Sequence, residues 1–225
     1  MSNTVDRPAY EALLFDMDGV LIRGRGTLTA VYEAAADDAL DELGAEVPAA
    51  ERGPFRQSQF GETMATRCRE AGLDPETFWT TRERFASERA NARIGSPPRT
   101  RFEDTAVLAD LSKPLGVVSN NRAATVEHVV ADLFPGRFTV AVGRDPTLEG
   151  YRRRKPDPHY IERALDRLGV DHALYLGDRK KDLLAARRAG IDGALVRREF
   201  NREVTVDESA LDVDGLRGLP ALLER

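Results

Sequence analysis

The chain has 225 residues, of which 41% are hydrophobic and 32% are charged, and its formal net charge is −5. An acidic chain lacks the basic footprint of a nucleic-acid-binding protein, and no apolar run approaches the roughly 18 residues that a membrane-spanning helix needs. We therefore expect no nucleic-acid partner and no membrane segment. The length suits one large domain, or one domain with an insertion, that can bury a core.

Cysteine and lysine are both scarce. The only cysteine, Cys68, cannot form an intramolecular disulfide, which favours the reducing cytoplasm, and its apolar neighbours at helical spacing indicate a core thiol. Residues 1–10 are polar and lack the apolar stretch of a signal peptide. Because lysines are so few, the position of each one is informative: they are Lys113, Lys155, Lys180 and Lys181.

The first predicted element is a strand that contains Ala12-Leu13-Leu14-Phe15. A continuous apolar run is typical of a strand buried on both faces of a parallel sheet. Asp16 and Asp18 follow at once, with Gly19 directly after them. A charged aspartate in a core costs several kcal/mol unless it is paired or binds a metal, and ligands of such sheets bind beyond the carboxyl ends of the strands. Taken alone, however, the stretch fits a polar turn equally well, because Asp-Gly is a common turn signal.

Three helices are predicted next, with no strand between them. They cover residues 28–43, 60–71 and 75–92. Gly44 and Gly72 mark the ends of the first two, and Pro75 occupies the first turn of the third. A hinge or linker is indicated at 95–98. We predict that residues 21–96 form an all-helical cap, inserted after the first strand in the position of a lid.

Helices and strands alternate in the rest of the chain. Helices are predicted at 102–111, 123–133, 158–168, 182–189 and 216–223, and strands at 115–118, 138–142, 173–176, 193–196 and near Leu211. Such alternation implies right-handed crossovers and a mostly parallel sheet. We therefore predict an α/β fold, in which residues 1–20 and 97–225 form a discontinuous Rossmann-like core with helices on both faces of the sheet, and the cap is the insertion.

Polar side chains follow two further strands of this predicted sheet. Ser119 and Asn120 offer a hydroxyl and free backbone amides at a strand end, which suits a phosphate, although a helix N-cap would explain them equally. Asp178 follows another strand, and Asp182 comes four residues later. An N-cap aspartate and its partner would explain this pair alone. It does not explain why two different strands both end in acidic pairs.

The acidic pairs at 16/18 and 178/182 would repel one another if they converged, and a cation would have to hold them together. An all-oxygen site of this kind suits Mg²⁺. Lys155 stands out from Arg152, Arg153 and Arg154, which we interpret as a solvated charge run. Pro156 fixes the backbone beside Lys155 and a helix follows, so its ammonium can neutralise both a phosphate and a nearby aspartate.

Together these residues resemble the four motifs of the haloacid dehalogenase superfamily of phosphotransferases. The motifs occur in order as Asp16-Met17-Asp18-Gly19-Val20, Ser119-Asn120, Lys155-Pro156-Asp157-Pro158, and Gly177-Asp178 through Asp182. Each motif alone is a weak signal. Four of them in order, each at a strand end or a helix start, form a specific one.

The resemblance implies a phosphatase that acts on a small phosphorylated metabolite. It makes Asp16 the nucleophile, which forms an aspartyl-phosphate, and Asp18 the general acid and then the general base. Ser119, the backbone amide of Asn120, and Lys155 would bind the phosphoryl oxygens.

The resemblance also implies Mg²⁺ as the cofactor. Its ligands would be the carboxylate of Asp16, the backbone carbonyl of Asp18 and the carboxylate of Asp178. Asp182 would hold the metal's waters or ligate directly. Arg179 stands where many relatives carry a small hydroxyl residue, and the sequence gives it no role.

The position of the cap resembles the helical-cap subgroup of the superfamily. No lysine precedes Lys113, which argues against the phosphonate hydrolases, and Asp18 argues against the dehalogenases, which lack that acid. The mutases place a His and a Lys in the cap, and residues 21–96 contain neither. A phosphoglycolate-phosphatase-like enzyme remains, and its alternatives are a mutase of the β-phosphoglucomutase type and a non-catalytic relative that binds a phosphorylated ligand.

Substrate choice is assigned to arginines of the cap region. Arg23 and Arg25 follow the first motif closely, and Arg56 lies in Gly53-Pro54-Phe55-Arg56. Each could pair bidentately with a carboxylate or a second phosphate of an acidic substrate. The sequence gives no indication of the oligomeric state.

Overall fold

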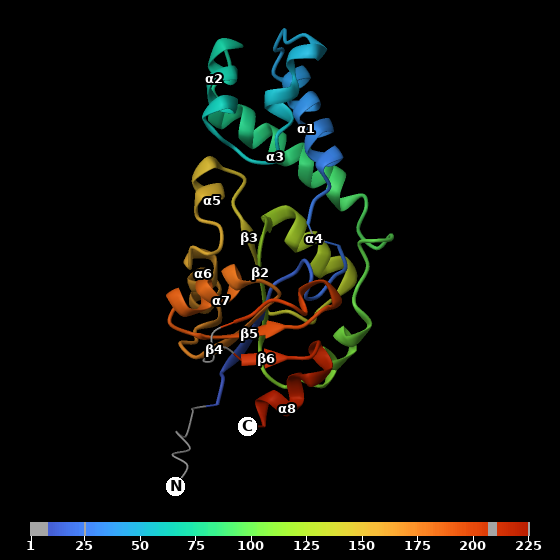
Figure 1. Ribbon diagram of the computed structural model, residues 1–225, viewed down its shortest axis with the longest axis vertical. Coiled ribbons are helices and arrows are strands. Elements are labelled where there is room, and N and C mark those ends of the chain that lie inside the picture. Colours follow the sequence, from blue (N-terminus) through green and yellow to red (C-terminus); the bar gives the residue numbers. More distant parts are fainter. Residues whose placement is uncertain (1–8, 25, 207–210, 225) are drawn as a thin grey trace.

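The computed structural model describes residues 9–24, 26–206 and 211–224. Helices α1 (Thr29–Glu42), α2 (Glu62–Glu70) and α3 (Pro75–Asn91) lie at one end of an elongated molecule, and α8 (Leu219–Leu223) lies at the other (Figure 1). A six-stranded sheet occupies the space between them. Within these ranges no helix combines the length and the apolar character that crossing a membrane requires.

The sheet is entirely parallel, in the order β3-β2-β1-β4-β5-β6. Its strands are β1 (Ala12–Phe15), β2 (Leu115–Arg122), β3 (Val140–Arg144), β4 (Ala173–Gly177), β5 (Asp192–Val196) and β6 (Leu211–Val213). The chain order reverses at β1, whose neighbours are β2 and β4, so ligands are expected at the carboxyl end of this central strand. The α/β fold class predicted from the sequence is confirmed.

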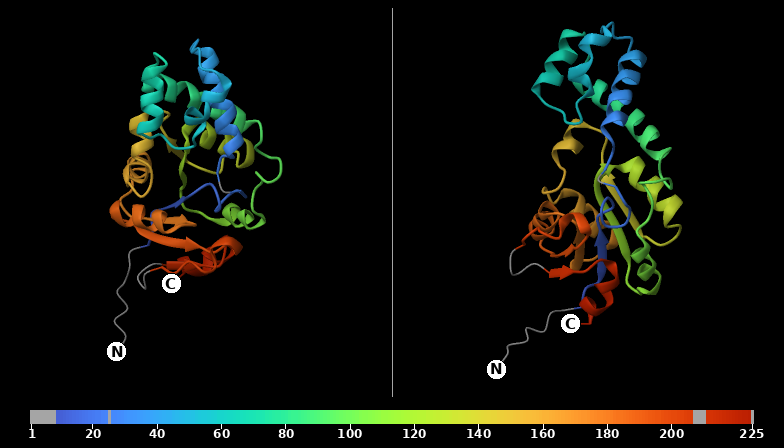
Figure 2. Two further views of the ribbon diagram at one scale, coloured as in Figure 1. Left: turned by 45° about the horizontal axis from the view of Figure 1, so that its top comes forward. Right: turned by 45° about the vertical axis from the view of Figure 1, so that its right-hand side comes forward.

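Helices cover both faces of the sheet. They are α4 (Ala123–Leu133), α6 (His159–Leu168) and α7 (Lys180–Arg188). The short helix α5 (Leu148–Arg152) packs against α3, and the 3-10 helix η2 (Gly53–Arg56) packs against α1 and α2. The other 3-10 helices are η1 (Ala49–Glu51), η3 (Glu103–Asp110), η4 (Glu199–Asn201) and η5 (Leu216–Gly218). In the right-hand view of Figure 2, α4 (green) and α7 (orange) lie on opposite sides of the central strands.

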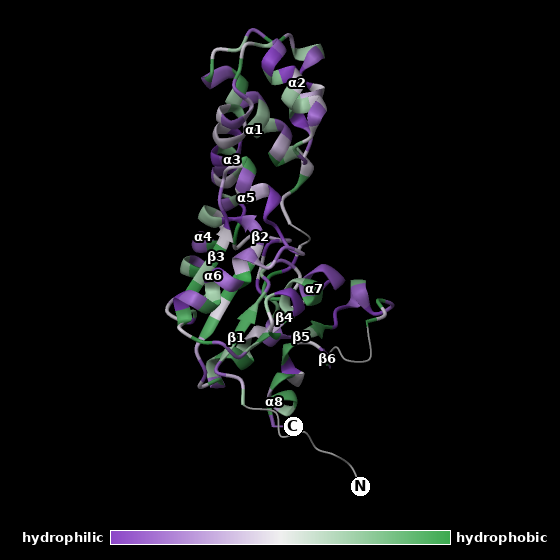
Figure 3. Cartoon of the chain, turned by 90° about the vertical axis from the view of Figure 1, so that its left-hand side faces the viewer, coloured by the Kyte–Doolittle hydropathy of each residue, from purple (hydrophilic) through white to green (hydrophobic). Residues whose placement is uncertain are grey.

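Strand β1 contributes to two hydrophobic clusters because its side chains alternate between the two faces. Leu13 and Phe15 pack in the cluster that contains Val126 of α4. Ala12 and Leu14 pack in the cluster that α6 and α7 cover. All four β1 side chains are fully buried, which is why the strand is continuously apolar, and Figure 3 shows β1 and β4 in the hydrophobic colour.

The three predicted helices of the cap are confirmed as α1, α2 and α3. Each of the first two ends next to a glycine in the left-handed region, Gly44 (φ +67°) and Gly72 (φ +71°). The carboxylate of Asp74 caps α3 by accepting a hydrogen bond from the backbone N–H of Thr77 at 2.8 Å. Cys68 is fully buried among these helices, and burial raises the pKa of its thiol to about 11, which suits a core residue. The domain boundaries at 20/21 and 96/97 stay a prediction.

Three segments differ from the sequence-based expectation. The predicted helix at 102–111 is the 3-10 helix η3, in which hydrogen bonds span three residues, as from the N–H of Thr105 to the carbonyl of Phe102. The loop after β3 contains α5, whose first turn is capped by the hydroxyl of Thr147. Strand β2 runs four residues beyond its predicted end and has a register shift between Val118 and Arg122.

Candidate active site

Three acidic side chains meet at the carboxyl end of the central strands. Asp16 follows β1, Asp178 follows the neighbouring strand β4, and Asp182 lies in the first turn of α7. One carboxylate oxygen of each lies within 4.8 Å of the others, and all three residues are buried. The sequence predicts a cluster of four carboxylates, and the structure brings three of them together, because the fourth, that of Asp18, pairs with other side chains. Asp182 also serves its own helix, because its Oδ2 accepts a hydrogen bond from the backbone N–H of Arg179 at 3.1 Å.

Asp178 is the member of this cluster that needs a cation most. Both its carboxylate oxygens are buried, and neither has a hydrogen-bond partner. Burial, followed by the charges of Asp16 and Asp182, raises its pKa to about 7. Burial likewise raises the pKa of Asp16 to about 6. Orphaned carboxylate oxygens that face other carboxylates fit a divalent cation, for which oxygen ligands suit Mg²⁺.

Lys155 connects the cluster to the rest of the site. Its Nζ lies 3.0 Å from Asp16 Oδ1 and 2.9 Å from Asp182 Oδ1, and it also contacts the hydroxyl of Tyr175 and the carbonyl of Val118. Burial alone would lower the pKa of this ammonium, but the two carboxylates raise it well above its usual value. Lys155 therefore stays charged beside the predicted nucleophile.

Ser119 and Asn120 lie on the bulged end of β2, not in a helix N-cap as the alternative held. The buried Ser119 Oγ accepts a hydrogen bond from the backbone N–H of Asn121 at 3.2 Å. The Asn120 side chain is committed to the backbone of Lys155, accepting from its N–H at 2.8 Å and donating to its carbonyl at 3.1 Å. Asn120 thus fixes the backbone position of the lysine, and the binding of a phosphate by its own amide stays a prediction.

The carboxylate of Asp18 is held apart from the other three. Its Oδ1 pairs with Arg99 Nη1 at 2.5 Å, and its Oδ2 accepts a hydrogen bond from Asn121 Nδ2 at 3.0 Å. Arg99 lies in the linker that leads out of α3, so a side chain from the cap linker orients the predicted general acid. Metal ligation through the backbone carbonyl of Asp18 stays a prediction.

Two glycines allow the carboxylates to approach the backbone. A Cβ atom on Gly177 would lie 2.3 Å from the Cβ of Asp182. Gly19 has φ +86°, and a Cβ atom there would lie 2.5 Å from Asp178 Oδ2. A side chain at either position would displace a carboxylate of the cluster.

We expect Gly19→Ala to destabilise the fold by about 2 to 3 kcal/mol, from backbone strain together with the clash against Asp178. Gly44→Ala is the matched control, because Gly44 also has positive φ but a Cβ atom there meets nothing within 4 Å. The control should lose only about 1 kcal/mol. Urea denaturation measures both, and equal losses in the two variants would contradict the close approach to Asp178.

A cavity of about 270 Å³ lies between the sheet and the cap, at the predicted catalytic residues. Asp16, Asp18, Ser119, Asn120 and Asn121 line it from the sheet side, and Thr27, Tyr32, Ser58 and Gln59 line it from the cap side. Three cations complete the lining, Arg154, Arg179 and Lys181. The pocket therefore places the carboxylate cluster below an opening that attracts anions.

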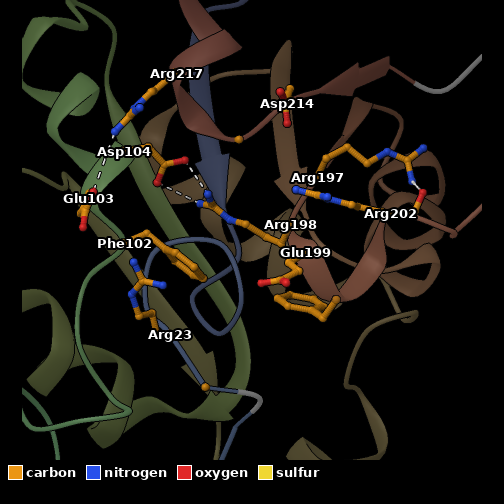
Figure 4. A pocket seen from close by; sticks show the side chains of 13 residues that line it. Arg23, Phe102, Glu103, Asp104, Arg197, Arg198, Glu199, Arg202, Asp214 and Arg217 are labelled. Carbon is orange, nitrogen blue, oxygen red and sulfur yellow. Dashed lines mark hydrogen bonds and ion pairs between the residues drawn. The ribbon is translucent and has the colours of Figure 1, made fainter.

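The arginines assigned to the substrate from the sequence lie elsewhere. Arg56 makes a bidentate pair with Asp37, at 3.1 and 2.9 Å. Arg23 stacks over the ring of Phe102 at 4.8 Å and lines a separate cavity of about 570 Å³ (Figure 4). Arg25 lies outside the described residues. The cations that line the pocket together with Asp16 are Arg154, Arg179 and Lys181 instead.

The sequence motifs assign no role at the site to Arg99, Asn121, Arg154 or Lys181, among others. Arg99 directly follows the predicted hinge at 95–98 and has no role predicted from the sequence, and Asn121 follows the predicted phosphate-binding pair. The interpretation of Arg154 as part of a solvated charge run is wrong, because Arg154 lines the pocket, whereas Arg152 and Arg153 are exposed. The scarcity of lysine is the one sequence signal that draws attention to Lys181.

The raised pKa values lead to a pH-dependent stability in the metal-free protein. The pKa of an unfolded aspartate is about 3.9, so between about pH 4 and pH 7 the folded state binds more protons at Asp16 and Asp178 than the unfolded state does. The free energy of unfolding should therefore fall as the pH rises through this range.

We expect Asp178→Asn to remove part of that fall, so that its metal-free stability at neutral pH exceeds that of the wild type by on the order of 1 to 2 kcal/mol. Added Mg²⁺ should stabilise the wild type increasingly as the pH rises through the same range, and the variant should gain little. Urea denaturation at several pH values measures both effects. A variant that gains as much from Mg²⁺ as the wild type would exclude Asp178 as a metal ligand.

Comparison with known proteins gives one consistent family. The chain matches the family described as haloacid dehalogenase-like hydrolase over residues 10–190. It is 31% identical to a phosphoglycolate phosphatase of Pectobacterium atrosepticum over 217 residues, covering 91% of this chain and 88% of the relative. It is 27% identical to the pyrophosphatase PpaX of Bacillus velezensis, covering 80% and 79%.

A solved structure gives the same fold. A mutant of CbbY from Rhodobacter sphaeroides, in complex with xylulose-(1,5)bisphosphate, superposes with a TM-score of 0.61. The match covers 92% of this chain and 95% of CbbY at 22% sequence identity.

Proposed function

Because the chain belongs to the haloacid dehalogenase-like hydrolases, we propose that it is a Mg²⁺-dependent phosphatase that hydrolyses a small phosphate monoester through an aspartyl-phosphate. The observation that carries this proposal is the buried Asp16, which contacts a protonated Lys155 and lies beside the carboxylate of Asp178, whose two oxygens accept no hydrogen bond. Buried carboxylates with raised pKa values beside a buried lysine are typical of catalytic sites and add nothing to hydrophobic packing.

In this proposal Asp16 Oδ attacks phosphorus, and the bond from phosphorus to the ester oxygen breaks. Asp18 donates a proton to the leaving oxygen, and then accepts one from the water that hydrolyses the aspartyl-phosphate. Arg99 and Asn121 orient Asp18 for both steps, while Ser119 and Lys155 bind the phosphoryl oxygens.

Asp16, Asp178 and Asp182 would hold the Mg²⁺. When bound, the ion would neutralise the charge that the phosphoryl oxygens develop during transfer. The cytoplasm is the proposed compartment, because the single cysteine is free and buried.

The names of the relatives support a small acidic substrate. The two curated relatives described above are a phosphoglycolate phosphatase and a pyrophosphatase, and the CbbY structure contains a bisphosphate. Phosphoglycolate is therefore the first ester to test. A mutase and a non-catalytic binder remain as alternatives, and the presence of both Asp16 and Asp18 in a pocket argues against a pure binder.

A screen of phosphate esters with and without Mg²⁺ tests the proposal. We expect Mg²⁺-dependent release of inorganic phosphate from at least one small ester, and no release in the presence of a chelator. Transfer of phosphate between positions of a sugar without net release would favour the mutase. No turnover of any ester would overturn the enzymatic assignment.

A further inference from the structure

The interface between α3 and the sheet contains more buried arginine than buried acid. Arg82 of α3, Arg122 at the end of β2 and Arg144 at the end of β3 are each at most 4% exposed in their side chains. They share one carboxylate, that of the fully buried Glu83. Glu83 contacts Arg144 directly, Arg82 at 3.4 Å and Arg122 at 3.8 Å. Three guanidinium groups and one carboxylate leave a buried net positive charge.

The remaining contacts of these arginines do not neutralise them. Arg82 lies over the rings of Tyr32 and Trp79, at 4.9 and 4.7 Å, and Arg122 lies over Tyr32 at 5.4 Å. Cation–π contacts stabilise a cation without removing its charge. Among the described residues, Arg82 Nε, Arg122 Nε and Arg144 Nη1 are buried without a hydrogen-bond partner. A buried charge is expensive unless it is paired, so this interface favours an anion.

Arg154 lies between the buried arginines and the pocket, because it shares the ring of Tyr151 with Arg144 and lines the pocket. Its guanidinium stacks on the ring of Tyr151 at 3.4 Å, and Arg144 faces the same ring at 5.8 Å. Its Nε donates to the carbonyl of Tyr151 at 2.7 Å, and in the described part of the chain its two Nη groups have no partner. The side chain lines the pocket, and Arg154 directly precedes Lys155 in the sequence. The stacking fixes the guanidinium, and its free N–H groups are available to a ligand.

The neighbouring cations of the pocket differ from Arg154. Arg179 Nε lies 3.6 Å from Asp178 Oδ2, and Lys181 is adjacent to Asp182 in α7. Both therefore lie beside the carboxylate cluster that would bind the metal. No described carboxylate pairs with Arg154, so its guanidinium is available to an anionic group of a ligand in the pocket.

We propose that the substrate carries a second anionic group, a carboxylate or a second phosphate, which Arg154 binds against the buried positive charge of Arg82, Arg122 and Arg144. The proposal rests on the phosphatase function above and names a specificity-determining residue for it. The phosphoryl group would bind beside Asp16 and the second anion beside Arg154. Esters that bear only one anionic group would be poor substrates.

The test uses matched pairs of phosphate esters on the full chain with Mg²⁺. Phosphoglycolate is compared with hydroxyethyl phosphate, and propanediol bisphosphate with hydroxypropyl phosphate, while pyrophosphate is tested separately. The first pair probes a carboxylate as the second anion and the second pair probes a phosphate. The variant Arg154→Met removes the charge and keeps the length, Arg154→Lys restores a charge, and Arg152→Met changes an exposed arginine of the same run.

We expect the wild type to prefer at least one doubly anionic ester about 10- to 100-fold in kcat/KM. Arg154→Met should lose most of that preference, mainly through a higher KM for the doubly anionic ester, and the singly anionic ester should be affected much less. Arg154→Lys should recover part of it, and Arg152→Met should behave as the wild type.

Equal loss for both members of a pair, or equal loss in Arg152→Met, would overturn the assignment of Arg154. A wild type that hydrolyses both members of every pair equally overturns the inference and leaves the phosphatase function standing, and this result does not depend on whether a variant folds. Absence of turnover of every ester overturns the phosphatase function instead, and the inference with it.

Discussion

Asp16→Asn is expected to lower Mg²⁺-dependent phosphate release by about 10⁴-fold or more. The amide of asparagine has nearly the shape of the carboxylate but cannot attack phosphorus, so the covalent route is lost. The substitution should not unfold the protein, because it removes one of three mutually repelling buried carboxylates, and Lys155 keeps its contact with Asp182 at 2.9 Å. Phosphate release and urea denaturation measure the two effects separately.

The matched control for this variant is Asp166→Asn, which changes an exposed aspartate of α6. Its activity should equal that of the wild type. A short incubation with a radiolabelled ester should label the wild-type protein, and Asp16→Asn should stay unlabelled. Full activity in Asp16→Asn would remove Asp16 from the role of nucleophile.

The largest effect on stability is expected for Glu83→Gln. Among the described residues, Glu83 is the acid that pairs with all three buried arginines, Arg82, Arg122 and Arg144. Removing one partner of a buried ion pair typically destabilises a protein by about 3 to 5 kcal/mol, because the other charge stays buried and unpaired. Here three charges would be left, so we expect a loss at the upper end of that range, measured as a lower urea midpoint.

Glu88→Gln is the control, since Glu88 lies on the same helix and pairs with Arg84 at 3.0 Å, but its side chain is 57% exposed. Its loss should stay below about 1 kcal/mol. Adding Arg144→Met to Glu83→Gln should recover part of the stability, because one unpaired buried charge is removed. A loss in Glu83→Gln no larger than that of Glu88→Gln would mean that the interface does not depend on this carboxylate.

Local sequence patterns were sufficient for most of the secondary structure. The apolar run Ala12–Phe15, the helix-ending Gly44 and Gly72, and the alternation after residue 102 each express a rule that acts within a few residues. The sequence patterns missed α5, although Thr147 is a residue of the capping type. They also ended β2 too early, because a bulge depends on the pairing of two strands and not on one strand alone.

The sequence by itself determined the fold class and the convergence of Asp16, Asp178 and Asp182, because adjacent parallel strands bring their carboxyl ends together wherever the intervening chain runs. Only the tertiary structure decided which arginines face the pocket. Arg56 pairs with Asp37, Arg99 orients Asp18, and Arg154 lines the cavity. The direction of a long side chain depends on neighbours that are distant in sequence. For this reason the sequence alone does not distinguish which of the 29 arginines face the pocket.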